Sequence, residues 1–281
     1  VFLLANFGLL AINAWEMIIR LWPLLLIAIG LDIAVGHRST LWSFAGLLIL
    51  IALLAGTLWL YGLRQQGGFL STPKQINQPL EGATRAKVEV QLPLGSIRFG
   101  SLSQGKDLLQ GTVQLGRNEQ FHVDYSVENG VGMYLLRSSG SMLFDLPTRN
   151  DDHWQWDLKC NATIPLDLNI SLGAGISYLD LHDLAVNTFE VDMGVGETTV
   201  ALRKGIEYQG KIDGAIGQTL ILIPRGMAVR INTGLTHVQV PEDFQRLDDV
   251  YTSPGYDGAS ARVNIEVSQA IGIIRIRYVE K

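Results

Sequence analysis

The residues best suited to metal chemistry are too widely spaced to form a recognisable site. Four histidines follow residue 65, and neighbouring ones are at least 29 residues apart: His122, His153, His182 and His237. A zinc site needs imidazole and thiolate ligands close together, and the single cysteine, Cys160, excludes a multi-cysteine site and an internal disulfide. We therefore predict no metal site, but the pair His182 and His237 stays open because stacked repeats could bring them together. Cys160 is predicted to be a small buried hydrophobe.

The densest group of polar and aromatic residues is segment 151–156, with the sequence DDHWQW. We interpret its start as a loop that leads into a strand. Alternation then places Trp154, Trp156 and Leu158 on one face of that strand, where the indoles either pack in a core or form an exposed recognition patch. Packing is the prediction, and the exposed patch is the alternative.

Other candidate motifs do not supply the groups that a reaction needs. Asp248 and Asp249 near Tyr251 offer carboxylates, but they lack the regular oxygen spacing of a calcium loop. Segment 161–163 (NAT) matches the glycosylation acceptor pattern, which is common by chance. No serine, cysteine or lysine has a recognisable activating neighbour. The sequence therefore predicts no catalytic, cofactor-binding or metal-binding residue and no bound cofactor, and we predict that the chain is not an enzyme.

Gly-X-Gly triplets resemble phosphate-binding loops but lack their context. They occur at 173–175 and 194–196, and each is followed by strand-like residues rather than by a helix. No third glycine stands at the dinucleotide-binding spacing, so no helix N-terminus is expected to receive a phosphate. We predict that these glycines form turns.

The elements that carry these glycines are predicted to be short strands in a repeat. Apolar residues alternate from Ile164 to Leu172, and similar patterns follow later in the chain. The leading glycines of four units stand at 173, 194, 214 and 234, in steps of 21, 20 and 20 residues, with the unit near 231 a looser copy. One such unit cannot bury its apolar face, whereas a stack can. We predict a repetitive β domain at 86–281, either β-solenoid-like or a pair of facing sheets.

The boundaries of this domain follow from composition. Segments 263–267 and 271–278 are strongly apolar and are predicted to be closing strands. Before residue 86, segment 71–82 is polar, contains Pro73 and Pro79 and lacks apolar periodicity. We predict that 66–85 is a linker.

Residues 1–65 have the composition of membrane-spanning helices. Segment 41–63 has no charged residue, and 1–40 contains only four. A 23-residue helix is roughly 35 Å long, enough to cross a hydrocarbon core of about 30 Å. Trp42, Trp59 and Tyr61 mark its ends as an interfacial aromatic belt does. We predict spans at 41–63 and 18–36 and a partial span at 1–14, preceded by missing sequence, with membrane lipids as partners.

Charge limits the partners but leaves the orientation open. The net charge of −5 lies wholly after residue 63, so we predict no nucleic-acid binding. Arg20, Arg64 and Lys74 on one side of the predicted spans outnumber Arg38 on the other, which favours a cytoplasmic β domain. The polar spacer and the positive charges expected upstream favour an extracytoplasmic one. We lean slightly to the latter and leave the side of the membrane open.

Several of these segments resemble a known family. Segments 3–10 (LLANFGLL) and 21–31 (LWPLLLIAIGL) resemble the transmembrane module of bacterial LiaI/LiaF-like proteins. Segments 172–175, 179–181 and 253–256 and the later glycine turns are similar to their C-terminal β domain, called a toast-rack and found in cell wall-active antibiotics response proteins. The resemblance implies a role in sensing or restraining responses to envelope stress, often beside a histidine kinase. The three predicted spans depart from the four that LiaF-like proteins often have.

The predicted fold is thus a membrane-anchored all-β protein of the bacterial cytoplasmic membrane. Our first hypothesis is a regulatory or sensory protein that acts through protein–protein contacts, with a membrane protein such as a histidine kinase as partner. The alternative is a structural scaffold or an accessory subunit of a larger membrane complex. The oligomeric state stays open.

Overall fold

The computed structural model describes residues 73–102, 105–115, 119–139, 155–234 and 238–279. Every regular element within these ranges is a β-strand, as the sequence predicts from residue 86 onward. The strands are β1 (Lys74–Pro79), β2 (Arg85–Leu102), β3 (Asp107–Val113), β4 (Gln120–Glu128), β5 (Val131–Ser139), β6 (Trp156–Asn161), β7 (Leu166–Asp180), β8 (Val186–Ala201), β9 (Tyr208–Pro224), β10 (Val229–Asn232), β11 (Val238–Gln239), β12 (Gln245–Leu247), β13 (Val250–Thr252) and β14 (Val263–Val279).

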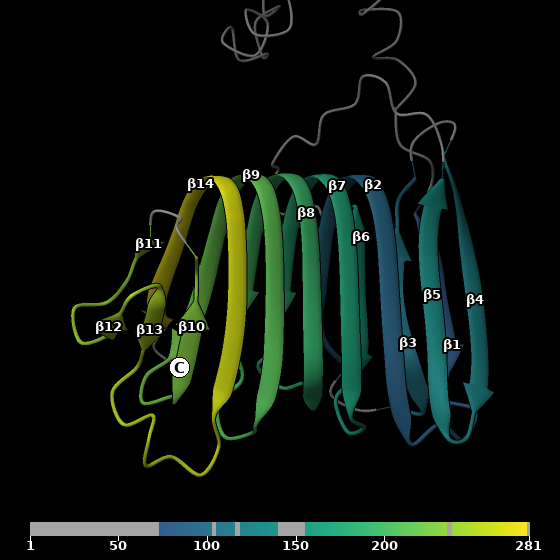
Figure 1. Ribbon diagram of the computed structural model, residues 1–281. Coiled ribbons are helices and arrows are strands. Elements are labelled where there is room, and N and C mark those ends of the chain that lie inside the picture. The colour runs from purple at the N-terminus through teal and green to yellow at the C-terminus, as the bar shows by residue number, and fades with distance from the viewer. Residues whose placement is uncertain (1–72, 103–104, 116–118, 140–154, 235–237, 280–281) are drawn as a thin grey trace, which may run out of the picture. The chain divides into compact units, whose positions relative to one another are not determined.

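Five long parallel strands, β2, β7, β8, β9 and β14, form the centre of the domain. Each strand runs along one side of the domain, bends sharply and returns along the other side (Figure 1). We call the halves before the bend the first wall and the halves after it the second wall. The predicted repetitive β domain is therefore confirmed as an all-β stack, and its two walls are halves of one continuous sheet that enclose one interior.

A column of glycines makes the bends. Gly95, Gly175, Gly196, Gly217 and Gly272 are paired in register, with φ between +144° and +149°. This is a conformation that only glycine adopts readily. The prediction that glycines form the corners of the repeat is therefore confirmed. The strands do not end at these corners, which corrects the expectation of separate short strands. Glycine changes the direction of the backbone at these points without interrupting its hydrogen bonding to neighbouring strands.

The predicted spacing of the repeat also needs correction. The bend glycines at 175, 196 and 217 are a constant 21 residues apart. Gly214, which was assigned to the leading position, is instead paired with Met193, and a Cβ there would lie 2.4 Å from Oε1 of Gln269. Gly214 therefore makes room for a neighbouring side chain.

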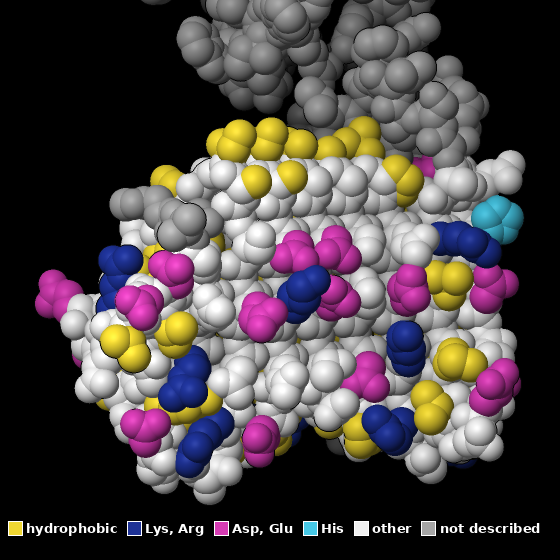
Figure 2. Space-filling model, viewed as in Figure 1, with side chains coloured by type: hydrophobic (Ala, Val, Ile, Leu, Met, Phe, Trp, Pro, Cys, Tyr) yellow, Lys and Arg dark blue, Asp and Glu magenta, His cyan; other side chains and the backbone are white. Residues whose placement is uncertain are grey.

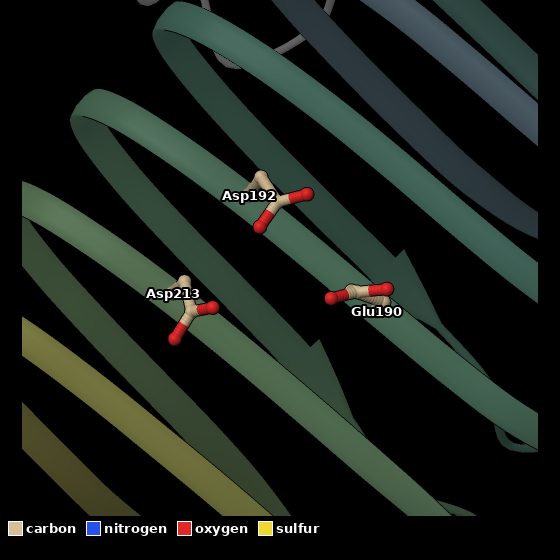
Figure 3. A group of neighbouring side chains, drawn as sticks. All are labelled: Glu190, Asp192 and Asp213. Carbon is tan, nitrogen blue, oxygen red and sulfur yellow. The ribbon is translucent and has the colours of Figure 1, made fainter.

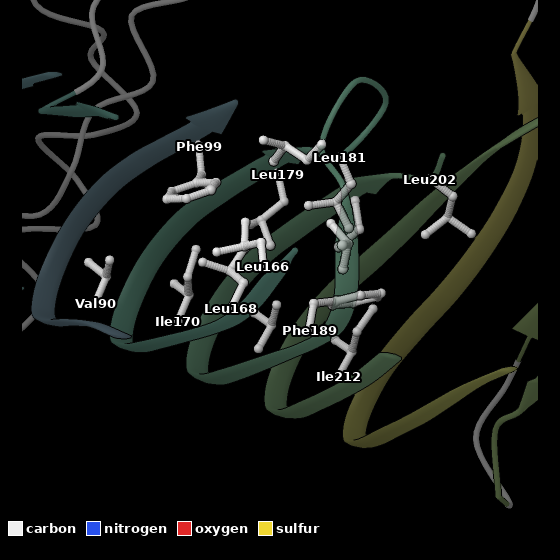
Figure 4. Packing of buried hydrophobic residues seen from close by; sticks show 14 of the residues in the cluster. Val90, Phe99, Leu166, Leu168, Ile170, Leu179, Leu181, Phe189, Leu202 and Ile212 are labelled. Carbon is white, nitrogen blue, oxygen red and sulfur yellow. The ribbon is translucent and has the colours of Figure 1, made fainter. Parts of the chain in front are cut away.

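The hydrophobic core fills the space between the walls, as Figure 4 shows for a group of these residues. Alternate side chains of β7, from Leu166 to Leu172, are at most 3% exposed, and Phe99, Leu179, Val191 and Ile212 are also buried. Burying one such side chain contributes about 1.5–3 kcal/mol. Alternation along each strand thus supplies the driving force for stacking.

A few polar side chains lie in this core just inside the bends. Ser177 Oγ donates to Thr198 Oγ1 over 3.1 Å, and Thr219 Oγ1 donates to Gln269 Oε1 over 3.0 Å. All four side chains are at most 6% exposed. Hydrogen bonding between rungs offsets the cost of burying them.

The order of the last rungs differs from the order of the sequence. β14 lies between β9 and β10, so the looser copy near 231 is not the rung that follows β9. β14 pairs with β9 along its whole length, whereas β10 and β11 are short outer strands beside β14. The long alternating pattern of β14 makes this possible, because only a strand of that length covers all of β9. Segments 263–267 and 271–278 are strand residues, as predicted, but both belong to the single strand β14. They do not close the stack, because β10 lies beyond β14.

At the other end of the stack, the first wall continues from β2 to β5 and β4, and the second wall continues from β2 to β6, β3 and β1. β1 lies inside the segment 66–85 that was predicted to be a linker. Its antiparallel pairing with β3 makes Lys74–Pro79 part of the sheet. Its polar side chains lie at an edge, where one buried residue, Ile76, is enough to attach it.

The predicted spans at 1–14, 18–36 and 41–63 lie outside the described residues. Within the part of the chain that the structure describes, there is no helix with the length and apolar character to cross a membrane.

Candidate functional site

A cluster of three carboxylates lies on the outer face of the first wall. Glu190 and Asp192 on β8 and Asp213 on β9 point outward, because they alternate with buried residues along their strands. Asp192 and Asp213 are neighbours in register, and oxygens of the three carboxylates lie within 4.8 Å of one another (Figure 3). The repeat thus brings carboxylates from adjacent rungs together.

A lysine from the same wall partly neutralises this cluster. Lys211 Nζ lies 2.6 Å from Asp213 Oδ2 and 3.0 Å from Glu190 Oε1. These two contacts hold the pKa of Lys211 above its usual range. Three carboxylates and one ammonium leave a net charge of −2.

Asp192 is the third carboxylate of the cluster. Ser171 Oγ donates to its Oδ2 over 3.4 Å. Partial burial, followed by the charges of Glu190 and Asp213, raises the pKa of Asp192 above its ordinary value. Carboxylate oxygens are ligands that hard cations prefer, but the Lys211 ammonium already lies against two of the three groups. The arrangement is suited to hydrogen bonding and charge pairing at a surface.

A shallow groove of about 790 Å³ crosses the same face. Its lining is mostly amide and charged side chains, including Lys87, Asn187, Gln209, Arg230, Asn264 and Glu266. Several groups in it already have partners: Asp167 Oδ1 accepts from Asn187 Nδ2 at 2.7 Å and from Thr188 Oγ1 at 2.9 Å. Such a face can form hydrogen bonds with a polar partner.

The histidines named from the sequence do not assemble in the described part of the chain. His122 is exposed on β4, and His182 lies in the turn after β7. His153 and His237 lie outside the described residues, so the possible pair of His182 and His237 stays a prediction.

The residues predicted to pack do so where the structure describes them. Trp156, Leu158 and Cys160 are fully buried, and burial raises the pKa of the Cys160 thiol to about 12. Trp154 lies outside the described residues. Asn161, the first residue of the glycosylation pattern, is 2% exposed. Its Nδ2 donates to the backbone oxygens of Gly105 and Asp107, so the amide already has a structural role.

The remaining candidate, Asp248 with Asp249, lies between β12 and β13. Arg246 Nε donates to the backbone oxygen of Asp248 over 2.9 Å, and the Arg246 guanidinium stacks over Tyr251. These contacts stabilise a tight turn with φ of +53° at Asp248.

Sequence reasoning named no site residue and missed the surface features that the repeat creates. Asp192 and Asp213 occupy the same place in units 21 residues apart, which is the signal that could have paired them. The residue before each bend glycine is apolar in all five long strands. Only the register of the strands places these five residues in one row.

Comparison with known families gives one match to this architecture. The family described as the N-terminal domain of toast_rack, DUF2154, matches residues 67–222. No curated protein sequence matches the chain.

A solved structure shares the fold at low sequence identity. The crystal structure of a candidate cell adhesion protein from Clostridium sporogenes has a TM-score of 0.64 and 19% identity, over 74% of this chain and 100% of that chain. A candidate adhesin from Bacteroides fragilis has a TM-score of 0.21 and 11% identity, over 74% of this chain and 98% of its own. The first likeness shows the fold alone, and the second is too low to support an argument.

Proposed function

The chain belongs to the toast-rack family, DUF2154, and from this premise we propose that it is a non-enzymatic protein of the bacterial cell envelope that acts through protein–protein contacts. The observation that carries the proposal is the parallel stack itself. Five rungs in register hold their outward side chains in continuous rows. A rigid surface of this kind favours recognition of a partner by many small contacts.

The proposed site of action is the bacterial cytoplasmic membrane, to which residues 1–65 would anchor the domain in several spans. The support is the uncharged segment 41–63 and the apolar segments before it. We lean to an extracytoplasmic β domain, for the reasons of composition given above.

Within this function, the role that we favour is regulatory or sensory. Its support is the resemblance of segments 3–10 and 21–31 to the LiaI/LiaF-like membrane module. The expected partner is another membrane protein, such as a histidine kinase, contacted in an amount that changes with envelope stress.

A second candidate function is a structural scaffold or an accessory subunit of a larger membrane complex. The candidate cell adhesion protein from Clostridium sporogenes has the same fold over its whole length, which is compatible with a purely structural use. A scaffold differs from a regulator in having a partner at constant stoichiometry.

The experiment that tests these roles is gentle detergent extraction of the full chain from its native membrane, followed by quantitative mass spectrometry. It is done with and without an antibiotic that acts on the cell wall, and an unrelated membrane protein with the same tag serves as the control. A substoichiometric partner whose amount changes with the antibiotic supports the regulatory role. A partner at a fixed ratio under both conditions supports the scaffold, and the absence of any specific partner would contradict both.

A further inference from the structure

A row of aliphatic side chains, three of them exposed and two partly buried, follows the bends of the long strands. It consists of the residue that precedes each bend glycine: Leu94, Ala174, Val195, Ile216 and Ile271. Val195, Ile216 and Ile271 are 51%, 47% and 64% exposed, respectively. We call this row the apical ridge. Figure 2 shows hydrophobic side chains in a row along the upper edge, where Figure 1 shows the strands bending.

The fold does not require apolar side chains on the apical ridge. The bend is made by the following glycine: at Gly196, for example, a Cβ would lie 1.9 Å from the backbone oxygen of Gly175. β-Branched residues suit strands, but threonine has that shape as well and is common at exposed positions. The three neighbouring aliphatic side chains that face solvent, Val195, Ile216 and Ile271, are therefore better explained by contact with a partner.

A trough runs beside the apical ridge on the first wall. Its volume is about 760 Å³, and its lining includes small residues next to the ridge: Pro93, Gly173, Gly194, Ala215 and Ala270. Both glycines in this set are required by the spacing of the rungs. A Cβ at Gly194 would lie 2.3 Å from the backbone oxygen of Gly173, and one at Gly173 would lie 2.4 Å from that of Pro93. The backbones pack closely at these two glycines, so the bottom of the trough has only small side chains, and the ridge side chains project beyond them.

Acidic side chains border both the trough and the ridge. Asp192 and Asp213 line the far side of the trough, and Glu197 follows the bend of β8 on the second wall. Two rows flank the ridge and the trough: Gln91, Ser171, Asp192, Asp213 and Ser268 on the first wall, and Ser96, Ile176, Glu197, Gln218 and Ile273 on the second. Neither row contains lysine or arginine, but Lys211 contacts Asp213 and Arg275 contacts Gln218 from neighbouring positions. The cluster of Glu190, Asp192 and Asp213 with Lys211 still has a net charge of −2. An anionic bilayer surface or a second copy of the ridge would place like charges together.

The dimensions of the trough fit a helix. Five strands at about 4.8 Å spacing give a row about 19 Å long, which is the length of a helix of about 13 residues. Side chains three or four residues apart on one helix face are about 5–6 Å apart, close to the spacing of the ridge residues. An apolar helical stripe can therefore lie along the ridge with the helix edge over Asp192 and Asp213.

We propose that the trough binds an amphipathic helix of a protein partner, with an aliphatic stripe against the apical ridge and lysine or arginine against Asp192 and Asp213. This inference rests on the proposed function and deepens it, because it names the surface used and the class of partner segment.

The test uses the full chain in nanodiscs of zwitterionic lipid and a fluorescent 18-residue peptide designed as a leucine-striped, lysine-edged helix. Binding is measured by fluorescence anisotropy, with empty nanodiscs as the baseline. The triple variant Val195→Thr, Ile216→Thr and Ile271→Thr keeps β-branched side chains but removes the apolar surface. We expect it to weaken binding by about tenfold or more, which corresponds to the loss of about 1.4 kcal/mol or more.

Two controls separate the ridge from general effects. Leu247→Thr changes a side chain on β12 that is 77% exposed, and it should leave the affinity within about twofold. Thermal unfolding of both variants checks that the domain stays folded. A peptide with glutamate in place of lysine should bind at least about tenfold more weakly at low salt, because its charges face Asp192 and Asp213.

Several results would overturn the proposal. Equal peptide affinity of the folded triple variant and the wild type would exclude the ridge, and equal affinity for both peptides would exclude the acidic border. If the wild type dimerises in sedimentation and the triple variant does not, the ridge joins two copies instead. If an environment-sensitive dye on Ile216→Cys reports an apolar surrounding in nanodiscs without peptide, the ridge lies on lipid.

Failure of this inference can be told apart from failure of the proposed function. A native-membrane partner that the triple variant still recovers would leave the function intact and overturn only the trough assignment. If the triple variant loses that partner while Leu247→Thr keeps it, the result supports both the proposed function and the trough assignment.

Discussion

The central rungs and the C-terminal end of the domain are stabilised in different ways. In β7, β8, β9 and β14 the backbones themselves fit together, with bend glycines in register and alternating side chains inside the walls. In β10 to β13 the strands are at most four residues long. The short strands cannot repeat the geometry of the rungs, so individual side chains hold them.

Side chains of the C-terminal end join its short strands and turns to one another. Ser253 Oγ accepts from the backbone N–H of Val229 and donates to the backbone oxygen of Met227, both at 2.8 Å. The guanidinium of Arg230 stacks over Tyr256 at 4.3 Å. A periodic sequence thus stabilises the central stack through its backbone, whereas the end of the stack depends on single polar and aromatic contacts.

Glycine substitutions should separate the two regions most strongly. Gly196→Ala would put a Cβ 1.9 Å from the backbone oxygen of Gly175, at φ +149°, and we expect a loss of more than about 4 kcal/mol in the free energy of unfolding. Gly234→Ala, at φ +58° with open space around it, should cost only about 1 kcal/mol. Urea unfolding followed by far-ultraviolet circular dichroism measures both, and similar losses would refute the distinction.

Truncation of a core side chain should have the next largest effect. Ile212 is fully buried between the walls, so Ile212→Ala is expected to cost about 2–4 kcal/mol through lost burial and a cavity. Leu247→Ala, at an exposed position of the C-terminal end, should change the free energy of unfolding by less than about 0.5 kcal/mol. The same denaturation experiment applies, and a large effect at Leu247 would mean that another surface covers it.

Removing one hydroxyl should destabilise the C-terminal end specifically. Ser253→Ala leaves the Val229 N–H and the Met227 carbonyl without the hydroxyl that now joins them, at a cost of about 1–3 kcal/mol. Amide hydrogen exchange should then become faster in β10 and β13 while β8 and β9 stay protected. Uniformly faster exchange in all strands would show that the end does not open separately from the stack.

A small, pH-dependent gain is expected at the acidic cluster. The pKa of Asp192 is raised in the folded protein, so its ionised form costs folding free energy at neutral pH, and that cost disappears as the pH falls below the ordinary range of an aspartate. Asp192→Asn should raise the free energy of unfolding by a few tenths of a kcal/mol at pH 7, because solvent screens this partly exposed group. The gain should vanish near pH 3, and a loss at pH 7 would contradict the raised pKa.

The local patterns of the sequence predict much of the central stack but little of its ends. Alternation from Ile164 to Leu172 and recurrence near 21 residues indicate a stacked β domain without any knowledge of distant contacts. β1 was missed because an edge strand with one buried residue has almost no apolar pattern. The position of β14 was missed because two candidate rungs, 229–239 and 263–279, compete for the edge of β9, and local patterns do not rank them.

Local patterns in the sequence were enough to predict a repetitive β domain from residue 86 onward, because burial of alternate side chains and glycine recurrence are local properties. Only the tertiary structure decided that the glycines are bends within continuous strands, and that β14 enters the stack beside β9. It also decided that Val195, Ile216 and Ile271 meet in one exposed row next to Asp192 and Asp213. The physical reason is register: which residues become neighbours across strands depends on pairing over tens of residues, and no local pattern contains that information.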